Sequence, residues 1–174
     1  MQRISPNAEK MKIEHHKPQT KYPKLQLDYQ NLLASCKGND GGPKHLPRHC
    51  DTSKADQEIT LNPVDKLKNC EPLIKYRTNG QIYSDDLVIN HELNDILNLN
   101  TPTLINCRKA IRLQVIKELT KIKGKNAAWP PTKIKKIIEK HKDKDETGQY
   151  IPYCQVVIYF LKKKTQHQIK SNHE

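Results

Sequence analysis

The sequence predicts an α+β fold, in which short strands in the first half of the chain precede a mainly helical, basic region. One observation is a hairpin signal within residues 73–83, where apolar and aromatic residues flank the turn dipeptide Asn79-Gly80. A second is the N-cap and first-turn proline of Thr101-Pro102, followed by apolar residues at helical spacing. Strand signals followed by helix signals favour α+β over a fold of one element type.

The elements expected in the first part of the chain are short. Residues 12–16 are predicted to form a strand, and residues 36–47 are interrupted by glycine and proline. A short helical turn is expected to start at Cys50 or Asp51. Residues 57–72 are interpreted as an irregular linker.

The later elements are expected to be helical. One helix is predicted to begin near Ser84 or Asp85 and to run to Leu97, and Pro130-Pro131 opens another. Residues 151–161 fit either a helix or a strand, although the lysines that follow suit a helix C-terminus. The helix after Thr101-Pro102 is expected to have one apolar face, made of Leu104, Ile111, Val115, Leu119 and Ile122.

Composition limits the class of protein. The 174 residues suffice for one domain, or for one small domain with an extension. Leu, Ile, Val and Phe make up 22%, just above the level typical of disordered chains, so the core should be small. We therefore expect a metal, a partner or a bound polyanion to contribute to stability.

The sequence argues against membrane insertion and export. The longest apolar run, residues 156–161, is far too short for a membrane span, and the first residues lack the apolar region of a secretory signal. The five cysteines are odd in number and include no Cys-x-x-Cys pair. This pattern favours a reduced, cytoplasmic setting over a disulfide framework.

Positive charge is concentrated late in the chain. The net charge is +12. The residues up to Cys107 carry 14 basic and 13 acidic side chains, whereas those from Arg108 onward carry 17 basic and 6 acidic side chains. A polyanion bound there would release counterions, so its binding would weaken steeply with salt. Because 26 of the 31 basic residues are lysines, a solvated lysine-rich surface is the alternative. The concentration in one region favours nucleic acid.

Three separated stretches within residues 13–56 carry the chemistry. An acidic residue and a histidine precede a proline, an Asn-Leu pair precedes a cysteine, and a Cys-Asp-x-x-Lys step ends the set. The stretches are Ile13-Glu14-His15-His16-Lys17-Pro18-Gln19, Tyr29-Gln30-Asn31-Leu32-Leu33-Ala34-Ser35-Cys36 and His49-Cys50-Asp51-Thr52-Ser53-Lys54-Ala55-Asp56. This ordered set resembles the HNH (ββα-metal, or His-Me finger) endonuclease family; each piece alone is a weak signal.

Further stretches resemble one subgroup of that family, associated with retrons and Septu-type phage defence. They are Lys21-Tyr22-Pro23, Asp28-Tyr29-Gln30-Asn31-Leu32-Leu33, His49-Cys50-Asp51 and Ile96-Leu97-Asn98-Leu99-Asn100, followed by Leu104 and Arg108. The resemblance covers roughly residues 13–164. It implies a ββα-metal nuclease core in residues 1–62, followed by a mainly helical basic extension in residues 63–174. It also implies a metal-dependent DNA endonuclease that acts as an anti-phage effector, with an ATPase partner protein.

The resemblance assigns a role to each site residue. His15 would be the general base, Asn31 would orient its ring, and Glu14 and Asp51 would hold Mg²⁺ or Mn²⁺. These types suit the chemistry, because a neutral imidazole can take a proton from water and hard divalent cations prefer oxygen ligands. Lys54 could reach a phosphate. The histidine after His15, His16, would be the base if the register slipped by one, and Arg108, Lys109 and Arg112 would contact duplex phosphates or an acidic partner.

One departure from the family concerns cysteine. Many relatives carry a Cys-x-x-Cys pair ahead of the acid-histidine strand, which completes a structural zinc site with a later pair. Here Cys36 and Cys50 match the later pair, and no cysteine precedes them. The missing pair would be explained by a truncated N-terminus or by a misassigned start site. A zinc site could still form from Cys36 and Cys50 with His45 or His49.

Two other interpretations stay open at this point. The three stretches could be a surface Glu-His-His, a turn capped by Asn31 and a helix capped by Asp51. The functional rival is a non-catalytic module, zinc-stabilised or degenerate, that binds nucleic acid or a protein partner. An enzyme acting on small substrates has little support, because the sequence has no phosphate-cradling glycine loop and no nucleophile elbow.

Overall fold

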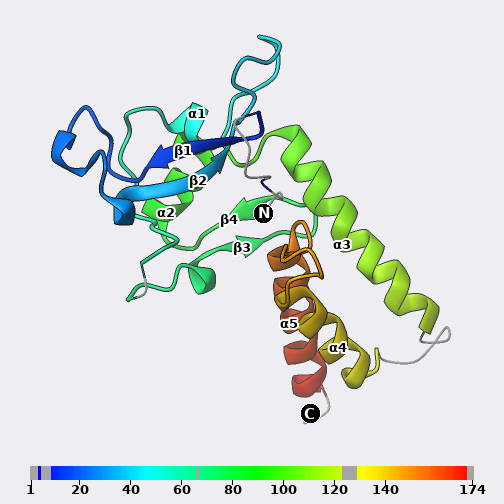
Figure 1. The fold of residues 1–174 in the computed structure, drawn as a ribbon. Coiled ribbons are helices and arrows are strands. Elements are labelled where there is room, and N and C mark those ends of the chain that lie inside the picture. Colours follow the sequence, from blue (N-terminus) through cyan, green and yellow to red (C-terminus); the bar gives the residue numbers. More distant parts are fainter. Residues whose placement is uncertain (1–3, 5–8, 66, 123–128, 172–174) are drawn as a thin grey trace. The chain divides into compact units, whose positions relative to one another are not determined.

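The structure is a computed structural model that describes residue 4 and residues 9–65, 67–122 and 129–171. The fold is mixed α+β, as predicted. Contacts divide the chain into two units, and Figure 1 draws the helices and strands of both. The first unit comprises Ile4–Arg77 with Gln81–Ile105, and the second comprises Thr78–Gly80 with the chain from Asn106 onward. The domain boundary predicted after residue 62 does not coincide with the boundaries of these two units. The division into a nuclease core and an extension stays a prediction.

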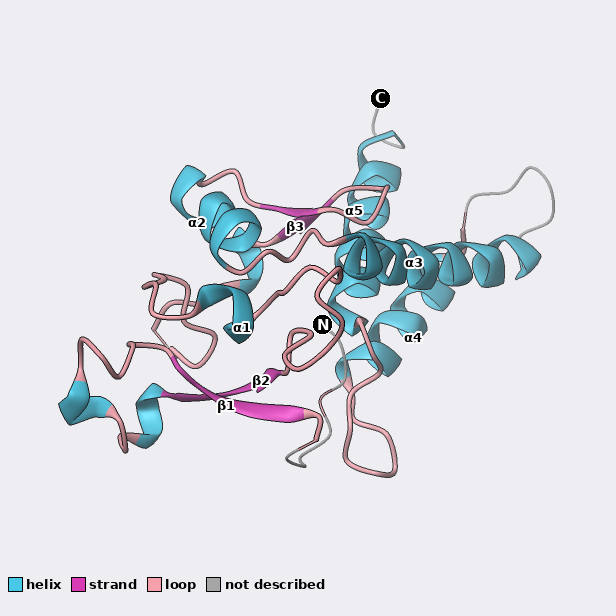
Figure 2. Cartoon of the chain, turned by 90° about the horizontal axis from the view of Figure 1, so that it is seen from above, coloured by secondary structure: helices cyan, strands magenta, loops and turns pink. Residues whose placement is uncertain are grey.

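The first unit begins with an antiparallel pair of strands and a short helix. Strand β1 (Met11–His15) pairs with β2 (Leu32–Cys36), so that Glu14 lies opposite Leu33 and Met11 opposite Cys36. The two strands run side by side in both views (Figures 1 and 2). Helix α1 (Asp51–Lys54) follows a long loop. The predicted strand and helical turn are confirmed within one residue.

The second half of this unit is a hairpin and a helix. Strands β3 (Lys75–Tyr76) and β4 (Ile82–Tyr83) pair antiparallel around the predicted turn, where Gly80 adopts a φ of 97°. Helix α2 (Leu87–His91) continues as a π-helical turn, Glu92–Ile96. The helix predicted to begin near Ser84 or Asp85 begins at Leu87, because the Asp86 carboxylate caps it by accepting from the Val88 and Ile89 amides. The core of this part is Ile82, Ile89 and Leu93.

The second unit contains three helices. They are α3 (Pro102–Ile122), whose first turn belongs to the first unit, α4 (Pro131–Lys142) and α5 (Cys154–Ser171). The starts predicted from Thr101-Pro102 and Pro130-Pro131 are confirmed. Their shared core is Val115, Leu119, Ile134, Val157 and Leu161.

Helix α5 resolves the alternative that the sequence left open for residues 151–161. The segment is helical from Cys154 onward, but the lysines at 162–164 that follow it lie within the helix and not at its end. They are exposed, so the helix continues past them without burying their charges. Among the described helices, none combines the length and the apolar character that crossing a membrane requires.

Candidate metal and catalytic sites

Two carboxyl groups meet where β1 approaches the start of α1. Glu14 is buried at 8% exposure, whereas its neighbour Ile13 points the other way and is 62% exposed, as strand alternation requires. Asp51 is the first residue of α1. The Glu14 and Asp51 carboxyl groups are linked by a hydrogen bond. The predicted pair is therefore brought together.

The pKa values of this pair are pushed apart. Burial, together with the hydrogen bond to Asp51, raises the pKa of Glu14 to about 7 against the opposing effect of Lys54. Burial alone would also raise the pKa of Asp51, but the hydrogen bonds with Glu14 and Lys12 outweigh it and lower that pKa. Below about pH 7 the pair thus shares a proton carried by Glu14. A divalent cation would have to displace this proton.

Each carboxylate also contacts a lysine. Lys54 is almost fully buried, with its Nζ 2.5 Å from Glu14 Oε1 and donating to the His15 carbonyl at 3.0 Å. Although this ion pair is close, no described residue is placed with hydrogen-bond geometry to Glu14 Oε1. On the other carboxylate, Lys12 Nζ lies 2.8 Å from Asp51 Oδ2. The expectation that Lys54 reaches a phosphate is corrected, because a buried ammonium stays with its partners.

His15 ends β1 beside the two carboxyl groups. Its ring Nε2 lies 2.9 Å from the Gln26 carbonyl oxygen, which can only accept, so Nε2 is the donor and Nδ1 is the nitrogen that has the lone pair in a neutral ring. The Gln19 amide nitrogen lies 2.9 Å from Nδ1 and 3.0 Å from Nε2, so it covers the ring edge between them. His15, Glu14 and Asp51 line one open cavity of about 250 Å³.

Asn31 holds the loop that supports His15. Its buried side chain accepts from the Lys17 amide at 2.7 Å and donates to the carbonyls of Lys17 at 3.0 Å and Leu25 at 3.2 Å. The structure thus corrects the expected direct orientation of the His15 ring. Asn31 acts through the loop, because Leu25 precedes the residue whose carbonyl receives the ring proton.

His16 occupies a different environment from His15. It is buried, burial lowers its pKa, and it does not line the cavity shared by the carboxyl groups. Its Nε2 has no hydrogen-bond partner among the described residues. These observations favour His15 over His16 as the residue that faces the site.

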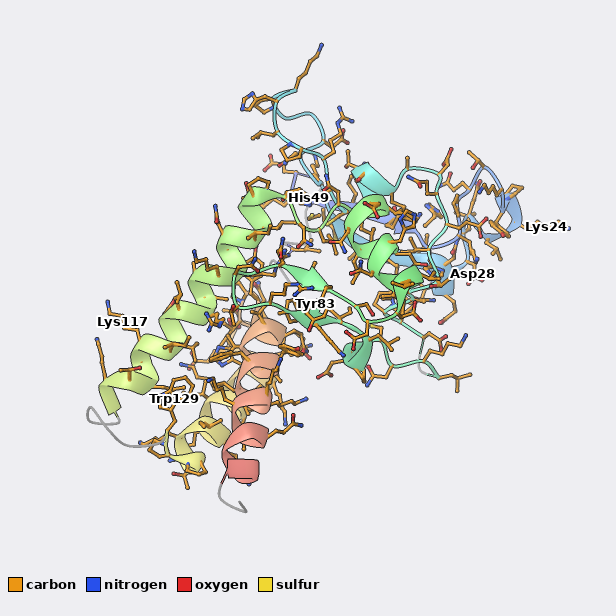
Figure 3. The ribbon with its side chains drawn as sticks, turned by 180° about the vertical axis from the view of Figure 1, so that it is seen from behind. Lys24, Asp28, His49, Tyr83, Lys117 and Trp129 are labelled. Carbon is orange, nitrogen blue, oxygen red and sulfur yellow. The ribbon has the colours of Figure 1, made fainter. Side chains whose placement is uncertain are left out.

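A second cluster could hold a metal ion. Cys36, at the end of β2, has its sulfur 3.4 Å from that of Cys50, and His49 Nδ1 lies 3.2 Å from the Cys50 sulfur and 3.8 Å from that of Cys36. His49 is marked in Figure 3. The hydrogen bond between the two sulfurs lowers the pKa of Cys36 to about 4, while that bond and burial raise the pKa of Cys50. The cluster therefore presents a thiolate, the form that binds metals. The alternative ligand, His45, is exposed and outside the cluster.

The backbone around this cluster is constrained. Cys50 adopts a φ of 55°, and its amide donates to the Leu97 carbonyl at 2.8 Å. A Cβ on Gly38 would lie 1.8 Å from the His49 carbonyl oxygen, so glycine is required there. Asn98 donates to the Arg48 carbonyl at 2.7 Å. The stretch at 97–98 thus fixes the loop that delivers His49 and Cys50.

The basic residues predicted to contact DNA differ in exposure. Arg108 is buried and donates to the Gly80 carbonyl at 2.6 Å. Arg112 donates to the Thr78 carbonyl at 3.2 Å and lies over the Phe160 ring at 4.6 Å. Both arginines are used in packing the second unit. Lys109 is exposed, as is Lys117 on the same helix (Figure 3).

Sequence reasoning missed three residues that touch the site. Lys12 could have been found, because it lies two residues before Glu14 and shares its face of the strand. Gln19 and Gln26 gave no such signal. The contact of the Gln19 side chain with His15 depends on the loop conformation, and Gln26 contacts His15 through its backbone carbonyl.

Among known proteins, no family model and no curated protein matches this chain.

Proposed function

We propose that this chain is a metal-dependent HNH endonuclease that hydrolyses DNA phosphodiester bonds. In this proposal β1, β2 and α1 form the ββα-metal core. The observation that carries it is the convergence of Glu14, Asp51 and His15 on one cavity. The order of these residues in the sequence, which resembles that family, supports the same function.

The carboxyl groups fit a hard divalent cation. Both offer oxygen ligands, the donor type that Mg²⁺ and Mn²⁺ prefer, although Glu14 Oε1 is paired with Lys54 and Asp51 Oδ2 with Lys12. Glu14 and Asp51 would therefore hold the cation. When bound, it would neutralise the phosphate and stabilise the leaving 3′ oxygen.

His15 supplies the base in this scheme. With its Nε2 proton held by the Gln26 carbonyl, Nδ1 can accept the proton of an attacking water. Asn31 keeps the loop, and with it that carbonyl, in place. The Gln19 amide has to give way before a water can reach Nδ1, because it lies 2.9 Å from that atom.

The cluster of Cys36, His49 and Cys50 is proposed to bind structural Zn²⁺. Two sulfurs and an imidazole are typical zinc ligands. The ion would connect Cys36, at the end of β2, to Cys50, which directly precedes α1. Asp51 is the first residue of that helix. Zinc would thus stabilise the same core that holds the catalytic cation.

The remaining parts of the proposal concern partners. The exposed lysines of the second unit would hold DNA phosphates and so supply affinity without sequence choice. The role as effector of an anti-phage system, the ATPase partner and the cytoplasmic location rest on the resemblance and the composition.

Plasmid cleavage tests the catalytic proposal. We expect the purified protein to nick or cut plasmid DNA with Mg²⁺ or Mn²⁺, and His15→Ala to reduce the rate by about 10²–10⁴-fold, the range for loss of a general base. His45→Ala is the matched control, because that histidine is exposed and outside both clusters. Equal cutting by His15→Ala and the wild type would show that the base is assigned wrongly.

The rival function is a non-catalytic module that binds nucleic acid or a partner. The observation that favours it is the lysine on each carboxylate, because Lys12 and Lys54 already neutralise part of the charge that a cation would. Equal DNA retention by the wild type and a Glu14→Ala/Asp51→Ala variant, with no cutting by either, would support this rival.

A further inference from the structure

The two lysines at the carboxyl pair differ in their freedom to move. Lys54 is enclosed, and its ammonium is fixed between Glu14 and the His15 carbonyl. The Lys12 side chain is 31% exposed and projects from β1. Only Lys12 can therefore leave its position without a change in the core.

Lys12 also has a second carboxylate within reach. Its Nζ lies 2.8 Å from Asp51 Oδ2 and 3.3 Å from Asp40 Oδ2. Asp40 is 45% exposed and stands in the loop that follows β2. The ammonium can thus shift toward Asp40 and keep an ionic partner when Asp51 is needed for another cation.

A cation bound to Asp51 must compete with this ammonium. Both are positive groups that need the same carboxylate oxygens, and two positive charges a few ångströms apart repel each other. We propose that Lys12 is a built-in competitor for the cation site, and that it moves to Asp40 when Mg²⁺ or Mn²⁺ binds. Lys12 would thereby set the cation concentration at which the site fills. This inference rests on the proposed function only in taking Glu14 and Asp51 as the cation ligands.

Calorimetric titration with Mn²⁺ in the absence of nucleic acid tests the inference. Lys12→Met keeps the length of the side chain and removes its charge, and we expect it to bind Mn²⁺ roughly fivefold tighter or more, as for loss of a partly buried charged contact. Lys44→Met removes one charge from an exposed lysine and should bind within about twofold of the wild type. Lys12→Gln repeats the test if the methionine variant does not fold.

Asp40→Asn separates the shift of Lys12 from simple electrostatics. With Lys12 present, loss of its second acceptor should weaken Mn²⁺ binding. In the Lys12→Met background the same substitution should change little, because no ammonium has to be accommodated. Equal weakening in both backgrounds would contradict the part assigned to Asp40.

Asp51→Asn distinguishes this inference from the proposed function. If the wild type binds Mn²⁺, Asp51→Asn abolishes binding and Lys12→Met binds as the wild type does, the competition is disproved while the cation site stands. If neither the wild type nor Lys12→Met binds, or if binding survives Asp51→Asn, both ideas fail. Binding by Lys12→Met alone would support the competition in its strongest form.

Discussion

At the scale of single residues, the buried Glu14 carboxyl group has the most consequential environment. Its pKa of about 7 lies above the ordinary value of 4.5, because burial and the Asp51 contact favour the protonated form. A group whose pKa rises on folding adds stability at low pH and loses it as the pH rises through the folded value. Stability should therefore decline between about pH 4.5 and 7 on account of Glu14.

Glu14→Gln, which mimics the protonated carboxyl group, should remove that decline. We expect the melting temperature of the variant, relative to the wild type, to rise between pH 5 and pH 8 when no divalent cation is added. Glu58→Gln is the control, because ion pairs with Lys17 and Lys21 lower the pKa of Glu58 and no such gain should follow. A constant difference between Glu14→Gln and the wild type across this range, measured by circular dichroism, would contradict the assigned environment.

The residues of the site were predictable to different degrees. Glu14, His15 and Asp51 were marked by residue type and order in the sequence, and the fold brings them together. The pairing of Asp51 with Lys12 was not predictable, because Lys12 lies 39 positions away in the sequence. Only the packing of β1 against α1 brings the two side chains together. Burial also changed expected roles, since Lys54 and Arg108 turned inward to satisfy polar groups.

At the scale of elements, the cluster of Cys36, His49 and Cys50 links β2 to α1. Zinc bound there should stabilise this link, since a ligand that binds only the folded state raises the free energy of unfolding. We expect added Zn²⁺ to raise the melting temperature by several degrees and Cys50→Ser to abolish the increase. Cys107→Ser, which alters a cysteine outside the cluster, should keep it. A zinc response that is unchanged in Cys50→Ser would rule out the cluster as the site.

Element types followed well from local signals, whereas element ends did not. The turn at Asn79-Gly80 and the starts of α3 and α4 came from residues whose backbone preferences are strong. The end of α5 was misjudged, because lysines near a helix end favour a terminus without enforcing one. The π-helical turn after α2 had no sequence signal.

At the scale of the whole molecule, the net charge of +12 is the feature that bears on substrate. Loss of the exposed Lys109 and Lys117 should weaken DNA binding at all sequences and reduce the slope of log affinity against log salt by up to about 2. Arg108→Ala should chiefly lower stability instead, because Arg108 is buried against the Gly80 carbonyl. Fluorescence anisotropy over a series of salt concentrations measures the slope; an unchanged slope in the double lysine variant would contradict the interface.

The central claim is that Glu14 and Asp51 hold one catalytic cation beside His15. Anomalous scattering from crystals grown with Mn²⁺ tests it most directly, because it locates the ion itself. We predict a peak within about 2.5 Å of an oxygen of each carboxylate, on the side of the cavity lined by His15. A crystal of protein that cuts DNA with Mn²⁺, yet shows no manganese at this pair, would contradict the claim.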